Sequence, residues 1–190
     1  TGSSNQDSGS IFLQSGASHG GNGGTIVLEA GESIDGEGGS IFMTGSSSVG
    51  GPGGNVFISS GNGRATTGGL LTLSSGSSSR NDGGSINIET RGSDSASSGN
   101  IEVATGNTNA GKVGDIALKS GSALDGLGGN ILISGGMSQI AGQIELRGAY
   151  GKLTGGNVVL RSGTSSSSAG GNIHVVSGEG ADDSGSITVP

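Results

Sequence analysis

The chain has 190 residues, of which 45 are glycine, and its formal net charge is −7 at pH 7. It has one tyrosine, three phenylalanines and no tryptophan, so it provides neither a basic stripe nor an aromatic platform for nucleic acid, which we exclude as a partner. The lack of cysteine excludes disulfides and thiol chemistry, and no apolar run is long enough to insert in a membrane.

A short pattern recurs thirteen times, almost always at a spacing of fifteen residues. Each copy has a glycine, any residue, an aliphatic residue, any residue and a second aliphatic residue. The repeat glycines are Gly9, Gly24, Gly39, Gly54, Gly69, Gly84, Gly99, Gly114, Gly129, Gly142, Gly156, Gly171 and Gly185. The first aliphatics are Ile11, Ile26, Ile41, Val56, Leu71, Ile86, Ile101, Ile116, Ile131, Ile144, Val158, Ile173 and Ile187. The second aliphatics follow two residues after each of these, from Leu13 to Val189.

This alternation puts both aliphatics of a copy on one face of a short strand. One strand cannot bury that face alone, whereas stacked copies bury it together. We therefore predict an all-β fold, a two-sided flattened β-solenoid of about 13 rungs with a 15-residue coil, as a single domain over residues 1–190. A glycine-rich and serine-rich composition is also typical of flexible linkers, but a linker would not keep thirteen aliphatic pairs in register.

Two further columns complete the predicted coil. The seventh residue after the first aliphatic is small, and we expect this column to face inward on the return side of the coil. Its members are Ser18, Ser33, Ser48, Gly63, Ser78, Ser93, Thr108, Ala123 and Ser138. The repeat glycines are expected at a corner that needs either a positive φ or a close backbone approach.

The aromatic residues occupy one column. Phe12, Phe42 and Phe57 all lie between the two aliphatics of their copies, and Val27 takes the same position in the copy between the first two. This position faces away from the predicted core, so the four side chains, here called the apolar stripe, would be exposed. Contiguous exposed apolar surface is typical of a contact with a partner. We therefore predict that the apolar stripe docks a lateral protein partner.

The ends of the predicted solenoid carry no recognisable cap. The repeat begins at Gly9 and its last aliphatic is Val189, and uncovered solenoid ends expose unpaired strand edges. Either related chains stack on both ends or the sequence is part of a longer solenoid, although Pro190 and the first eight residues provide partial protection of the edges.

Sites for chemistry are weakly indicated, and we predict that the chain is not an enzyme. His19 and His174 lie eleven copies apart, so they do not share a site. Glu32, Asp35 and Glu37 are the nearest approach to an acidic cluster, and a solvated corner explains them better than a cation site. We predict no catalytic residue, no cofactor and no metal.

The string Gly128-Gly129-Asn130-Ile131-Leu132-Ile133-Ser134-Gly135 and its counterparts resemble the Ser/Gly-rich repeats of secreted or cell-surface structural and adhesive proteins of algae and other microbes. The resemblance covers nearly the whole chain, and it implies a β-solenoid located outside the cell or at its surface. It transfers no functional residue. Serine runs such as Ser165 to Ser168 are candidates for O-linked carbohydrate.

These observations predict a structural subunit or segment of an extracellular filament, appendage or matrix. Copies would assemble end to end by β-stacking, with the apolar stripe as a lateral contact. The alternative is a surface-binding module, either an adhesin rod or an ice-binding protein. Ice-binding solenoids usually present ranks of outward threonines, and here charged and bulky residues interrupt the outward columns.

Overall fold

The chain contains neither helix nor strand in residues 7–189, which are the residues that the computed structural model describes. The predicted all-β solenoid with 13 rungs is therefore wrong, because the described chain is coil interrupted by bends. The expected protection of the ends by the first residues and by Pro190 concerns positions that lie largely outside the described residues.

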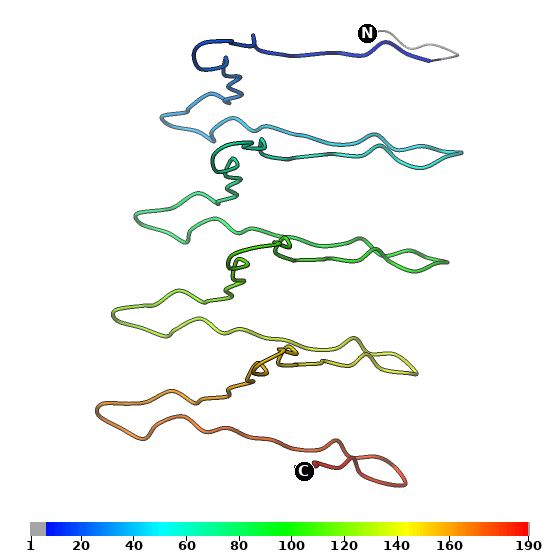
Figure 1. Cartoon of the computed structure of the whole chain (residues 1–190), viewed down its shortest axis with the longest axis vertical. Coiled ribbons are helices and arrows are strands. Elements are labelled where there is room, and N and C mark those ends of the chain that lie inside the picture. Colours follow the sequence, from blue (N-terminus) through cyan, green and yellow to red (C-terminus); the bar gives the residue numbers. More distant parts are fainter. Residues whose placement is uncertain (1–6, 190) are drawn as a thin grey trace. The chain divides into compact units, whose positions relative to one another are not determined.

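The chain divides into two units, Thr1–Gly99 and Asn100–Pro190. Both are built from the same repeat, and the prediction of a single repeat domain stays a prediction. Within each unit the backbone runs out to a bend and returns, once per repeat (Figure 1).

One bend falls between each aliphatic pair and the next. In the first unit the bends cover residues 19–21, 34–36, 49–51, 64–66, 79–81 and 94–96. In the second unit they cover 109–111, 124–126, 138–140, 152–154, 166–168 and 181–182. The fifteen-residue period of the sequence is therefore a period of loops rather than of stacked strands.

A backbone hydrogen bond closes most of these loops at their base, which we call the loop neck. The N–H of Gly39 donates to the carbonyl oxygen of Gly31 at 2.9 Å, and the N–H of Gly54 donates to that of Ser46 at 2.8 Å. The same bond is donated by Gly24, Gly69, Gly84, Gly142, Gly156, Gly171 and Gly185. In every case the donor is a repeat glycine, and the acceptor lies six to eight residues earlier in the chain.

The loop neck explains why the solenoid prediction is wrong. A β-solenoid requires the backbone groups of one coil to pair with the next coil. Here the repeat glycine pairs within its own loop instead. The segment left between two necks, such as residues 40–45, is long enough for a short strand, but among residues 7–189 no backbone hydrogen bond joins it to another repeat.

Close approach, and not a positive φ, accounts for glycine at most necks, although a Cβ on Gly171 or Gly185 would meet nothing nearer than 3.5 Å. A Cβ on Gly39 would lie 3.0 Å from the Ala30 Cβ and 3.1 Å from the Gly31 nitrogen, and a Cβ on Gly24 would lie 3.0 Å from the Ser15 Cβ. Among the described residues, a positive φ occurs at Gly111 and Gly126, of which neither is a repeat glycine. Of the two reasons expected for these glycines, the structure thus supplies the steric one.

The column of small residues does not face inward, so that prediction is also wrong. Five of its six serines lie just before the bends, are exposed, and accept a hydrogen bond from the backbone N–H three residues later. The bonds from Gly21 to Ser18, Gly36 to Ser33, Gly51 to Ser48, Asn81 to Ser78 and Ala96 to Ser93 measure 2.9 to 3.2 Å. Ser165, the seventh residue after Val158, accepts the same bond from Ser168 at 2.9 Å. This is the usual local role of serine in turns.

No core forms among the described residues, since none of them is buried. The chain exposes 19388 Å² in all. A folded monomer of 18.0 kDa exposes about 8,000 Å² and its extended chain about 26,000 Å². The accessible surface is therefore nearer to that of an open chain than to that of a packed domain.

The loop neck gives a direct test of this architecture. In Gly39→Ala the new Cβ would crowd Ala30 and Gly31, so the hydrogen bond of residue 39 should lengthen or break. Such a bond contributes about 0.5–1.5 kcal/mol, so we expect the amide of residue 39 to exchange with solvent about two- to tenfold faster, after correction for its intrinsic rate. NMR hydrogen exchange measures this directly.

Gly38→Ala is the matched control, because a Cβ there would meet nothing nearer than the Gly31 oxygen at 4.0 Å. The amide of residue 39 should keep its protection in that variant. Equal exchange in the two variants would contradict the steric role of the repeat glycine.

Candidate partner-contact surface

The aliphatic pairs form an exposed but ordered apolar surface. After Ile11, the first aliphatics are 46 to 56% exposed, and before Val189 the second aliphatics are 54 to 74% exposed. Apolar side chains at the bends, such as Val49 and Leu124, are fully exposed. The aliphatic pairs picked out by the alternation are therefore less exposed than the apolar side chains at the bends, although they are not buried.

First aliphatics that have a repeat before them are better shielded than Ile11. Ile11 is the first aliphatic of the earliest repeat and is 86% exposed, well above the exposed fractions of the twelve first aliphatics that follow. Each aliphatic pair thus leaves about half to three quarters of its surface uncovered within one chain.

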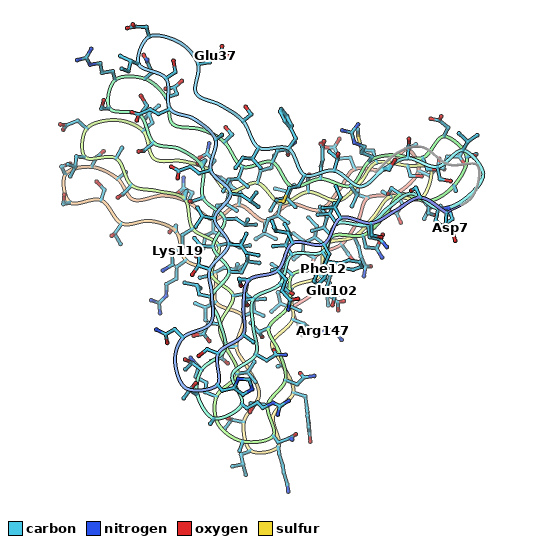
Figure 2. The ribbon with its side chains drawn as sticks, turned by 90° about the horizontal axis from the view of Figure 1, so that it is seen from above. Asp7, Phe12, Glu37, Glu102, Lys119 and Arg147 are labelled. Carbon is cyan, nitrogen blue, oxygen red and sulfur yellow. The ribbon has the colours of Figure 1, made fainter. Side chains whose placement is uncertain are left out.

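The structure exposes all four residues of the apolar stripe, each in its own repeat. Phe42 and Phe57 are 87 and 89% exposed, more than the aliphatics on either side of them. Phe12 (Figure 2) and Val27 are exposed to a similar degree. The docking of a partner on this stripe stays a prediction.

The repeat pattern of the sequence does not identify a second set of exposed apolar residues. They lie at or beside three consecutive bends of the second unit: Leu124, Leu127, Met137, Ile140, Tyr150 and Leu153. The repeat pattern draws attention to the aliphatic pairs and away from the loops. The available signal was the presence of large apolar residues in loops otherwise made of small and polar ones.

Charged groups lie mostly apart from one another. Two ion pairs form among residues 7–189: Lys112 Nζ to Asp115 Oδ2 at 2.8 Å, and Arg147 Nε to Glu145 Oε1 at 3.0 Å. The side chains of both pairs are exposed, and exposed pairs of this kind contribute little stability.

The candidate residues for other chemistry are also exposed. Glu32, Asp35 and Glu37 lie on one loop, with Glu37 on its outer part (Figure 2). Within the described part of the chain, no group of three or more His, Asp or Glu side chains is arranged to hold a metal ion, and no pocket is present. His19 and His174 lie in different units.

Comparison of the chain with known protein families, with curated proteins and with solved structures finds no match. Among residues 7–189 there is also no helix of the length and apolarity needed to cross a membrane. The geometry of the exposed apolar and charged groups is therefore the basis for the function proposed below.

The apolar stripe is tested by the double substitution Phe42→Ser with Phe57→Ser. Each phenylalanine is nearly fully exposed, so its loss should leave the loops intact, whereas burying a phenylalanine in a contact stabilises that contact by about 1.5–3 kcal/mol. We expect the double variant to associate at least tenfold more weakly, measured by sedimentation velocity.

Leu124→Ser with Leu127→Ser is the control, since both leucines are as exposed as the phenylalanines but lie in or directly after a bend. Unchanged association of the phenylalanine variant, or equal weakening of both variants, would remove the stripe as a specific contact.

Proposed function

We propose that this chain is a structural, self-associating segment of an extracellular filament, appendage or matrix. The observation that carries the proposal is the exposure of thirteen aliphatic pairs at a nearly regular spacing, because the chain leaves half or more of each pair uncovered. A surface of this kind is suited to association and to shape more than to chemistry.

The energetics support association. Ordering a residue of the backbone costs about 1–2 kcal/mol, and the burial of apolar surface is the main term that offsets this cost. A chain that exposes 19388 Å² and buries no described residue has little such burial of its own. Contact with the apolar surface of another molecule would supply this burial.

Other copies of the chain are the best match for that surface. A second copy presents aliphatic pairs at the same fifteen-residue spacing, so contacts made at one repeat recur at the next. Repetition of a weak contact along two chains raises the total affinity well above that of a single contact.

The end-to-end β-stacking expected from the sequence does not enter the proposal, because residues 7–189 form no strand. The extracellular location follows from the resemblance to Ser/Gly-rich repeats of secreted and cell-surface proteins, and it is part of the proposal. O-linked sugar on the exposed run Ser165 to Ser168 would be compatible with it.

The proposal predicts assembly that depends on concentration. Sedimentation velocity and negative-stain electron microscopy over a concentration series should show a monomer at the lowest concentrations and elongated or sheet-like assemblies of uniform repeat at higher ones. Particles of one size at every concentration would contradict the proposal. If those particles also shaped growing ice crystals, the surface-binding alternative would replace it.

A further inference from the structure

Charge is distributed unevenly between two parts of the chain. Residues 7–63, here called the acidic segment, contain Asp7, Glu29, Glu32, Asp35 and Glu37 and no lysine or arginine, for a formal charge of −5. Residues 146–178, here called the cationic segment, contain Arg147, Lys152 and Arg161 and no aspartate or glutamate, for a formal charge of +3.

Both segments present their charges to solvent. All eight of these side chains belong to exposed residues. Within the described residues, the one ion pair that involves them joins Arg147 to Glu145, which lies just outside the cationic segment. The acidic segment in particular is not neutralised from within.

The apolar residues of the two segments differ in kind. All three phenylalanines of the chain lie in the acidic segment, whereas the cationic segment contains the single tyrosine, Tyr150, and the exposed Leu153. A lysine or arginine near an aromatic face is attracted by the ring, so the phenylalanines favour a cationic partner in addition to the carboxylates.

We propose that the acidic segment of one copy docks on the cationic segment of a second copy. The inference rests on the proposed self-association and names the surfaces that meet in it. Opposite charges steer two such surfaces together and select their register.

The geometry of this contact determines the type of assembly. The two docking surfaces are different parts of one chain, so after a contact forms one copy still has a free cationic segment and the other a free acidic segment. Contacts of this heterologous kind continue from copy to copy and produce open filaments unless the rotation closes a ring. The charge pattern thus gives a filament a direction.

The experiment uses the full chain and three variants. The acid-reversed variant carries Glu29→Lys, Glu32→Lys, Asp35→Lys and Glu37→Lys, which changes the acidic segment from −5 to +3. The cation-reversed variant carries Arg147→Glu, Lys152→Glu and Arg161→Glu, which changes the cationic segment from +3 to −3. The control carries Arg64→Glu, Arg80→Glu and Arg91→Glu, which alters the net charge by the same −6 outside both segments.

Each reversed variant alone should associate about tenfold more weakly than the natural chain by sedimentation velocity, since one exposed ion pair changes an equilibrium a few-fold and three act together. An equimolar mixture of the two reversed variants should recover association, because the reversed segment of each then meets an opposite charge on the other. Association of the natural chain should also fall as salt rises to about 0.5 M, through screening. The control should associate within about twofold of the natural chain.

The possible failures are distinguishable. If the natural chain associates and the reversed variants do so equally well, or if their mixture stays dissociated, the charge contact is overturned and self-association stands. If salt or charge reversal changes the size of a monomer independently of concentration, the two segments meet within one chain, which also overturns the contact. If the natural chain never associates, both the proposed function and this contact are overturned.

Discussion

The hydrogen bond from a repeat glycine to a carbonyl six to eight residues earlier organises the described chain more than any other interaction. It sets where nine of the twelve loops begin and end, and its donor pairs with a carbonyl of the same loop. At several necks it also favours glycine, since a Cβ at Gly39 would crowd Ala30 and Gly31. Because the backbone pairs locally, the aliphatic pairs stay at the surface of the chain. Their burial then requires contact with another molecule.

The fifteen-residue period, the two aliphatic columns and their order of exposure follow from the sequence, because alternation specifies which residues share a face. The predicted strands failed because alternation does not specify what the backbone of that face bonds to. The serine column shows the same limit, since a small residue suits a thin interior and also a turn. Ser33 takes the turn, where its Oγ accepts the N–H of Gly36 at 2.9 Å.

The candidate contact surface was predicted more completely on the aliphatic face than in the loops. Phe42 and Phe57 stand out because the repeat gives them a common position, and their exposure agrees with that position. Leu124 and Tyr150 fall in loops, where the repeat sets no expectation, so only the structure identifies them as exposed apolar groups. The sequence shows the uneven distribution of charge. Only the structure shows that these charged residues are exposed and so accessible to a second copy.

The loop neck also tolerates changes in loop length. The acceptor lies eight residues before the donor at Gly39, seven at Gly156 and six at Gly142, and the same bond forms each time. Closing a loop of this size takes on the order of 10–100 ns, and no loop has to wait for another, because each closes with its own atoms. The ordering of one chain should therefore be fast at any repeat number, which leaves the encounter between chains as the slow, concentration-dependent step.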